Sequence, residues 1–237
     1  MRHRRRHREL RRAVLEANRL LPATGLVPLT WGNVSQVDRE AGVFAIKPSG
    51  VPYSELTVRD IVVLDFELCA VEGRLRPSSD APAHAELYAR LTSIGGVCHT
   101  HSKFATAFAQ ARSALPCCGT THADAFHGTV PLARPLTPGE VADCYEVNTG
   151  LVLAETLAEL GLDPLEMPGA LAAGHGPFTW GPDARAAVEN AVTLESVAEM
   201  AFLTRAIAGE MRTLESYVLE KHYARKHGAK AYYGQRD

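Results

Sequence analysis

The chain begins with apolar residues at helical spacing. Leu10, Val14, Ala17 and Leu21 recur every third or fourth position, which places them on one face of a helix. Pro22 follows directly and is expected to end that helix. The pattern therefore predicts an amphipathic first helix with one buried face.

Short runs typical of β-strands come next. Residues 43–46 and 61–64 are apolar, and turn-forming residues such as those at 47–50 separate them. Residues 94–99 predict another strand, and the paired glycines near its start indicate close backbone packing. A further short strand is predicted at 170–173.

Helices are predicted between and after these strands. Pro82 fits the first turn of a helix that ends near Leu91, and Ser102 is a good N-cap for a helix through Gln110. Other helical patterns occupy residues 150–160, 183–208 and 211–226. Short strands with helices between them and at both ends predict a layered α/β domain.

Composition limits the function classes. The chain has 237 residues, a hydrophobic fraction of 46% and a net charge of −2, which suit one globular domain. Seven of the first twelve residues are arginine, so we interpret residues 1–7 as a disordered basic arm, with His3 and His7 solvated, and residues 8–237 as the domain. Neither nucleic acid nor a membrane is expected as a partner, because no second basic patch with aromatic residues follows and no apolar run reaches the roughly 20 residues that span a bilayer.

The cysteines indicate a reducing compartment. They are five in number, two are adjacent, and none forms a Cys-x-x-Cys pair. The start of the chain does not resemble a secretory leader. A cytoplasmic protein with free thiols is the expected result.

Three histidines and one acid predict a metal site. His99 and His101 are two residues apart at the end of a predicted strand, so both imidazoles project from one face. His175 directly follows the predicted strand at 170–173, and Asp80 stands at the start of the helix before His99. Three imidazoles and a carboxylate are ligands that suit zinc, manganese or cobalt in a catalytic site.

A second group of residues predicts a phosphate site beside the metal. These residues combine turn glycines, hydroxyls, an amide and one lysine, which suit a phosphate monoester. They are Asn33, Lys47, Ser49, Gly50, Ser78 and Ser79. Ser79 adjoins Asp80, which brings the two predicted sites together. Neither GxxxxGK[ST] nor GxGxxG occurs, so a nucleotide phosphate is not indicated.

Several motifs, taken in order, match one known family. They are residues 29–35 (LTWGNVS), 46–51 (IKPSGV), 77–80 (PSSD), 93–96 (SIGG), 99–102 (HTHS), 119–124 (GTTHAD), 174–178 (GHGPF) and 221–235 (KHYARKHGAKAYYGQ). From about residue 8 to residue 235, the chain resembles the L-ribulose-5-phosphate 4-epimerases of the class II aldolase/epimerase superfamily. The resemblance implies a three-layer α/β/α fold with a mainly antiparallel central sheet, assembled as a homotetramer with active sites between subunits.

The resemblance also implies roles for individual residues. It assigns metal ligation to the four residues named above and the substrate phosphate to the hydroxyl, amide and lysine group. A neighbouring subunit would contribute Asp124 and Tyr233 as general acid/base groups, with His222 close by and Thr120 and Glu146 in support. One divalent metal per subunit is expected, with Zn²⁺ favoured and Mn²⁺ or Co²⁺ as alternatives.

The implied activity is epimerisation at C4, which interconverts L-ribulose 5-phosphate and D-xylulose 5-phosphate by breaking and remaking the C3–C4 bond. One alternative is a class II aldolase that cleaves L-fuculose 1-phosphate or a related sugar phosphate. In those aldolases a glutamate stands where Asp80 stands here, and the Tyr-Tyr-Gly-Gln tail fits the epimerases better. A more distant alternative is a non-catalytic interaction domain such as the adducin head, although such domains have typically lost the metal ligands.

Overall fold

A seven-stranded sheet forms the centre of the protein, and the computed structural model describes residues 2–229 and 231–233. The strands lie in the order β4-β3-β2-β1-β5-β7-β6, and every neighbouring pair is antiparallel. Their bounds are β1 Asn33–Asp38, β2 Val43–Ile46, β3 Val62–Asp65, β4 Ala70–Glu72, β5 Gly96–His99, β6 Gly169–Ala172 and β7 Gly176–Gly181.

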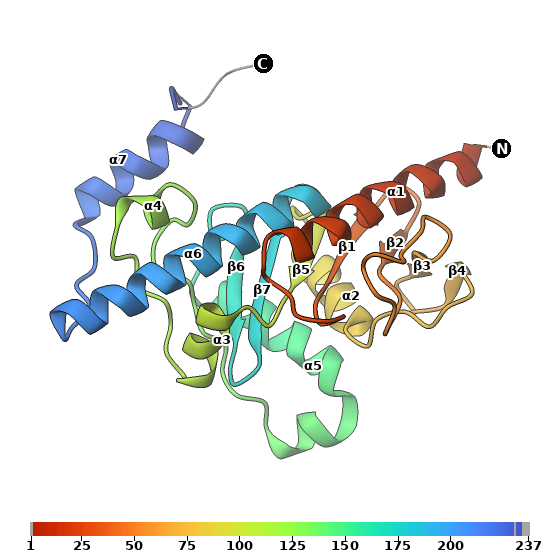
Figure 1. Ribbon diagram of the computed structural model, residues 1–237, viewed down its shortest axis with the longest axis horizontal. Helices are drawn as coiled ribbons and strands as arrows, with labels where there is room; N and C mark the ends of the chain where they lie inside the picture. The colour runs from red at the N-terminus through yellow and green to blue at the C-terminus, as the bar shows by residue number, and fades with distance from the viewer. Residues whose placement is uncertain (1, 230, 234–237) are drawn as a thin grey trace.

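Helices cover both faces of this sheet (Figure 1). They are α1 Arg2–Ala23, α2 Ala81–Arg90, α3 Lys103–Gln110, α4 Thr120–Ala123, α5 Pro138–Glu159, α6 Ala184–Ala208 and α7 Ser216–His227. Helices α1 and α6 share a core with one face of the sheet, and α2 and α5 share a core with the other. The expected three-layer α/β/α fold with an antiparallel central sheet is therefore confirmed. Within the described residues, none of the helices has the length and apolar character needed to span a bilayer.

Alternation along the strands separates the two cores. In β2, Phe44 and Ile46 pack with α2 and α5, whereas Val43 and Ala45 pack with α1 and α6. This follows from the two-residue period of a strand, which sends successive side chains to opposite faces. Because both faces are covered, all four residues of β2 are buried and read as a continuous apolar run.

The paired glycines at 95 and 96 bring the strand β5 against the start of α6. A Cβ on Gly95 would lie 2.0 Å from the carbonyl oxygen of Pro182, and one on Gly96 would lie 2.2 Å from the carbonyl carbon of Asp183. Only glycine permits this approach. The close packing that the sequence predicted at this strand is confirmed.

The first helix differs from the expectation. It begins at Arg2, whereas we expected residues 1–7 to be an extension before the helix. Arg6 pairs with Asp38, and the His7 Nδ1 lies 3.0 Å from Glu72 Oε1. His7 is only 7% exposed, so its predicted solvation is wrong. These acidic partners lie far along the chain, where local pattern does not reveal them.

Candidate active site

Three imidazoles meet at one edge of the sheet. His99 is the last residue of β5, His101 follows two residues later, and His175 lies in the turn between β6 and β7, beside β5. One nitrogen from each ring lies within 4.8 Å of the others, and the Nε2 atoms of His99 and His101 are 3.1 Å apart. Two ligands of a tetrahedral zinc ion are roughly 3.4 Å apart, so these donors fit a divalent cation.

Two of these rings have partners on the side away from the cluster. The Nδ1 of His99 lies 2.9 Å from the carbonyl oxygen of Pro177, to which it donates, and its ring stacks on Phe178 with centroids 4.1 Å apart. The Nδ1 of His175 lies 3.4 Å from the Tyr145 hydroxyl. Such contacts fix the ring orientation and leave Nε2 for a metal. Burial lowers the pKa of His99 to about 3, so its imidazole is neutral, as a ligand must be.

Asp80 lies in the same cavity as the histidines, at the N-cap of α2. Its Oδ2 accepts a hydrogen bond of 2.6 Å from Asn33 Nδ2. Burial raises the pKa of Asp80, but the neighbouring imidazoles and this hydrogen bond outweigh burial, and the carboxylate stays ionised. Asp80 is not one of the three residues in the close nitrogen cluster, so its place as the fourth ligand stays a prediction.

The predicted phosphate residues surround the same cavity, whose volume is about 560 Å³. Its lining comprises Thr30, Trp31, Gly32, Asn33, Lys47, Pro48, Ser49, Gly50, Ser78, Ser79, Asp80, His99, His101, Tyr145, Glu146 and His175. The structure thus brings together all six predicted phosphate residues and all four predicted metal ligands. The cavity is large enough for a five-carbon sugar phosphate.

Lys47 is the most unusual member of this lining. It is 2% exposed, and its Nζ donates to the carbonyl oxygen of Pro48 at 3.2 Å and lies 4.9 Å from the centre of the Tyr53 ring. Burial lowers its pKa to about 8. In the described part of the chain, no carboxylate pairs with this ammonium. A buried cation without an acidic partner favours the binding of an anion.

The turn before β1 places Asn33 at the cavity. Gly32 has a φ of +90°, and a Cβ there would lie 2.9 Å from the carbonyl oxygen of His99, so this position requires glycine. The Tyr53 hydroxyl lies 2.8 Å from the carbonyl oxygens of both Trp31 and Gly32. Tyr53 therefore braces this turn with its hydroxyl while its ring faces Lys47.

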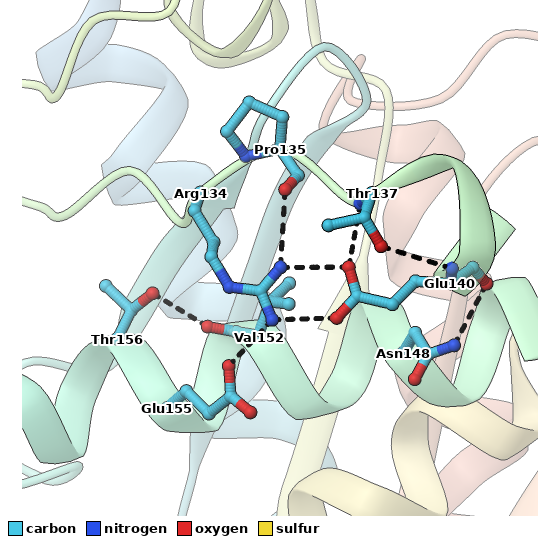
Figure 2. Close-up of polar contacts among 8 residues, drawn as sticks. All are labelled: Arg134, Pro135, Thr137, Glu140, Asn148, Val152, Glu155 and Thr156. Atoms are coloured by element: carbon cyan, nitrogen blue, oxygen red, sulfur yellow. Dashed lines mark hydrogen bonds and ion pairs between the residues drawn. The ribbon is translucent and has the colours of Figure 1, made fainter.

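Tyr145 and Glu146 reach the cavity from α5, which the sequence pattern recognised only at 150–160. The helix is kinked at Cys144, where φ is −133° and ψ is 71°. Figure 2 shows what holds the segment before the kink: Arg134 binds Glu140 through two hydrogen bonds of 2.8 and 2.9 Å and also reaches Glu155. Thr137 and Glu140 form a capping box, a signal that was present in the sequence and was missed.

Asn148 bridges the kink itself (Figure 2). Its Nδ2 donates to the carbonyl oxygen of Glu140 at 2.9 Å, which supplies a partner where the helical ladder is interrupted. The kink leaves Tyr145 beside His175 and Glu146 in the cavity lining. The contacts of Arg134 and Asn148 therefore hold the kinked segment of α5 that carries these two side chains.

The remaining predicted residues form a separate cluster at α4 and α7. Asp124 Oδ1 lies 3.1 Å from His222 Nδ1, and Arg225 donates to both carboxylate oxygens of Asp124. The ring of Tyr233, which is 56% exposed, lies 4.6 Å from Arg225 Cζ. None of these four residues lines the metal cavity of its own chain. Sequence reasoning gave no role to Arg225, although it lies in a quoted motif.

Comparison with known proteins gives consistent results. The family model for the class II aldolase and adducin N-terminal domain matches residues 12–202. The L-ribulose-5-phosphate 4-epimerase UlaF of Salmonella paratyphi B is 52% identical over 228 residues, which cover 96% of this chain and 99% of that protein.

Solved structures share the fold. An L-fuculose 1-phosphate aldolase has a TM-score of 0.76 at 27% identity, with 92% of this chain and 95% of that chain covered. The L-fuculose-1-phosphate aldolase of Thermus thermophilus has a TM-score of 0.67 at 27% identity, with 84% and 97% covered. The family model matches most of the sequence, and one relative is 52% identical along nearly its whole length. This chain therefore belongs to the class II aldolase and adducin N-terminal domain family.

Proposed function

We propose that this protein is an L-ribulose-5-phosphate 4-epimerase, an isomerase that interconverts L-ribulose 5-phosphate and D-xylulose 5-phosphate. The observation that carries the proposal is a single cavity that joins a three-histidine cluster to a buried lysine, which has no acidic partner among the described residues. One end of such a cavity suits a divalent cation and the other a phosphate. The 52% identity to an L-ribulose-5-phosphate 4-epimerase supports the same substrate.

The metal would be held by His99, His101 and His175, with Asp80 as the fourth ligand. Zn²⁺ is the favoured ion because imidazole and carboxylate suit it, and Mn²⁺ or Co²⁺ are alternatives. When bound, the ion supplies Lewis acidity for the negative charge that develops on the ketone side of the sugar. One ion per subunit is proposed.

The phosphate would lie at the opposite end of the cavity. Lys47 supplies the cation, while the serine hydroxyl groups at 49, 78 and 79 and the backbone N–H groups of Gly50 and Ser79 would supply hydrogen bonds; the N–H groups of Ser49 and Ser78 already donate to the carbonyl oxygens of Arg76 and Lys47. Asn33 donates to Asp80 and to Ser78 Oγ, at 2.6 and 3.1 Å, so this one amide links the two ends of the site. Holding the phosphate keeps the two-carbon fragment in place after the C–C bond breaks.

The chemistry proceeds by proton transfer at the C4 oxygen. A base removes the C4 hydroxyl proton, the C3–C4 bond breaks, and its electron pair moves into the ketone to give an enediolate and glycolaldehyde phosphate. The aldehyde then turns and presents its other face, the bond reforms, and an acid returns a proton to the C4 oxygen. Asp124 and Tyr233 are proposed as these two groups, one for each face, with His222 beside Asp124.

These two groups would come from a neighbouring subunit of a homotetramer. In the described residues, the Asp124 cluster does not line the metal cavity of its own chain, so a second copy is needed to bring them together. The groove between α4 and α6 leaves large apolar side chains exposed, including Met200, Leu203 and Ile207, as a subunit interface would. Thr120 stands at the start of α4 and is assigned a supporting role with Glu146.

Mixing subunits tests the shared site directly. His101→Asn and Asp124→Asn would each be inactive alone. In hybrids of equal amounts, about one quarter of the interfaces would pair an intact metal cluster with an intact Asp124, and activity would return in that proportion. A chain that carries both substitutions is the control and gains nothing on mixing. Hybrids that stay inactive would show that Asp124 does not act across subunits.

The reaction itself is tested with metal-loaded protein and L-ribulose 5-phosphate, with the appearance of D-xylulose 5-phosphate followed with and without a chelator. Conversion that the chelator abolishes is the expected result. Cleavage of L-fuculose 1-phosphate without epimerisation would instead support the aldolase alternative. That alternative is tested because the fold is similar to those of two L-fuculose 1-phosphate aldolases. A protein that binds no metal and turns over neither sugar would be an interaction domain.

A cytoplasmic location completes the proposal. All five cysteines are free, including the adjacent pair Cys117 and Cys118. Free thiols persist in a reducing compartment, where phosphorylated sugars are also retained by their charge. Fractionation of cells that express the chain at its natural level is the test.

A further inference from the structure

Arg225 binds the carboxylate of Asp124 with two donors. The Nε of Arg225 lies 3.0 Å from Oδ1, and one terminal nitrogen lies 2.7 Å from Oδ2. Both side chains are mostly covered, with 23% and 17% of their surfaces exposed. A planar guanidinium on a carboxylate in this way fixes the orientation of the carboxylate as well as its charge.

The same residue also holds Tyr233. The Tyr233 ring lies over the guanidinium, at 4.6 Å from Cζ, which is the geometry of a cation–π contact. The carbonyl oxygen of Arg225 accepts hydrogen bonds from the backbone N–H of Tyr232 at 2.9 Å and of Tyr233 at 3.1 Å. The segment after α7 therefore folds back onto Arg225, which contacts both groups assigned to proton transfer.

We propose that Arg225 is a positioning residue that sets the separation of Asp124 and Tyr233 and holds Asp124 as the base. This inference rests on the proposed function, because it presumes that these two groups transfer the C4 proton. Neither group contacts the other in the described contacts, so their relative position depends on what lies between them. Arg225 is the residue that touches both.

The charges around Asp124 agree with a base. Burial raises its pKa, but the hydrogen bonds from Arg225 and His222 outweigh burial and bring the pKa below its ordinary value. The other titratable contact is His227 Nε2, which donates to the Asp124 backbone oxygen at 2.8 Å. The α6 residues that line the groove beside α4 are uncharged. Two nitrogens of Arg225 and one of His222 occupy three of the roughly four lone-pair directions of the carboxylate, which leaves one for substrate.

Anchoring of α7 is the competing role for Arg225, because this helix has no buried residues. A second set of contacts anchors the helix without touching Asp124: Tyr223 stacks on His127 with ring centroids 4.4 Å apart, and Glu220 lies 2.9 Å from His127. Tyr223 also stacks on His227, which contacts the Asp124 backbone oxygen, so Tyr223→Leu loosens α7 while leaving in place the contacts of the Asp124 carboxylate with Arg225 and His222. Arg212→Met, which removes an exposed partner of Glu210, is the control for loss of charge alone.

The experiment compares Arg225→Met and Arg225→Lys with the wild-type tetramer, all loaded with metal and matched for thermal stability. Arg225→Met is expected to lower kcat roughly 100-fold with little change in KM, as a misplaced catalytic group does. The acid limb of its kcat/KM profile moves to higher pH, since burial of Asp124 remains while its strongest cationic partner is lost. Arg225→Lys recovers part of kcat, and Tyr223→Leu and Arg212→Met move neither kcat nor the acid limb.

Asp124→Asn and Tyr233→Phe separate this inference from the function on which it rests. If they leave turnover unchanged, the proton-transfer roles are wrong and the inference falls with them. If they lower kcat but Arg225→Met changes neither kcat nor the acid limb, only the inference about Arg225 is overturned. The same holds if Arg225→Met changes kcat and the acid limb no more than Tyr223→Leu does. The double variant Asp124→Asn/Arg225→Met supports it by losing no more than Asp124→Asn alone, and additive losses contradict it.

Discussion

Replacing Lys47 with methionine separates the stability of this protein from its binding of phosphate. Methionine has nearly the length and volume of lysine but no charge. Lys47 is 2% exposed, yet its ammonium has only one carbonyl oxygen and one aromatic face as partners in the described structure. We therefore expect the substitution to stabilise the fold while weakening the binding of the substrate.

The magnitude follows from the pKa of Lys47. Burial lowers it from an ordinary value of 10.5 to about 8, and keeping the group protonated at pH 7 therefore costs about 3 kcal/mol of folding free energy. Loss of the hydrogen bond to Pro48 removes about 1 kcal/mol and loss of the cation–π contact with Tyr53 about 0.5–1 kcal/mol. The net gain is about 1–1.5 kcal/mol, or roughly 2–6 °C in Tm for a chain of this length.

The pH dependence provides a second measurement. A lysine whose folded pKa is depressed binds more protons in the unfolded chain between pH 8 and 10.5, so wild-type stability rises across that window. The advantage of Lys47→Met is therefore complete below about pH 8 and fades toward pH 10.5. The wild-type kcat/KM for the sugar phosphate should fall as the pH rises past about 8, because the free enzyme loses the cation that binds phosphate.

Thermal unfolding of the metal-loaded protein at several pH values, with and without inorganic phosphate, tests both statements. Phosphate should raise the Tm of the wild type much more than that of Lys47→Met. Lys103→Met, which removes an exposed lysine at the start of α3, is the matched control and should change neither quantity. A lower Tm for Lys47→Met at pH 7 would refute the reasoning, since it would mean that the ammonium stabilises the fold without a ligand.

Other predictions concern the elements that support the site. Gly96→Ala should destabilise the fold by about 3 kcal/mol in urea unfolding, because its Cβ would meet backbone at 2.2 Å, while Gly139→Ala, with open space, should not. Tyr145→Phe should weaken metal binding by up to about tenfold in a chelator competition, because His175 loses its outer partner; unchanged affinity would dismiss that contact. Arg134→Met should leave Tm nearly unchanged but speed amide exchange at 138–148, and equal exchange would show that the kinked segment does not depend on Arg134.

The sequence revealed most of the site because its signals are local. The His-x-His spacing places two imidazoles on one face of a strand end, and Ser78 and Ser79 directly precede Asp80 in the chain. The turn at 47–50, in contrast, is brought beside them by backbone pairing with residues 76–78. Three strands, β1, β4 and β7, were missed, and β1 and β7 show the opposite case. In β1, the polar side chain of Ser35 is fully buried, and His84 and Tyr88 lie within hydrogen-bond distance of its hydroxyl, at 2.6 and 2.7 Å. These partners are distant in sequence, so the local pattern could not reveal that a serine here can be buried.

The strand β7 was missed because it begins with Gly-Pro, which argues against an interior strand. Pro177 lacks a backbone N–H, but the site uses its carbonyl oxygen, which accepts a hydrogen bond from His99 Nδ1. Helix α3 shows the same limit at its N-terminus. Ser102 occupies the N-cap as predicted but makes no capping hydrogen bond, and the carboxylate of Glu195 instead accepts from the N–H groups of residues 104 and 105.

The charges of the cavity explain why its polar groups are held by the fold before any ligand arrives. The cavity lining holds two acidic side chains, Asp80 and Glu146, and one lysine, Lys47, while the neutral imidazole of His99 adds no charge. The lining without a metal would therefore repel a phosphate dianion. A divalent cation among the imidazoles reverses that sign, after which a phosphate at Lys47 is attracted from both ends. Among the described residues, the buried Oδ1 of Asn33 accepts no hydrogen bond, so this oxygen is left to accept one from a hydroxyl group of the substrate. The folding free energy lost by burying the Lys47 ammonium is thus recovered when a phosphate binds to the metal-loaded cavity, which couples the stability of the fold to the presence of a phosphorylated substrate.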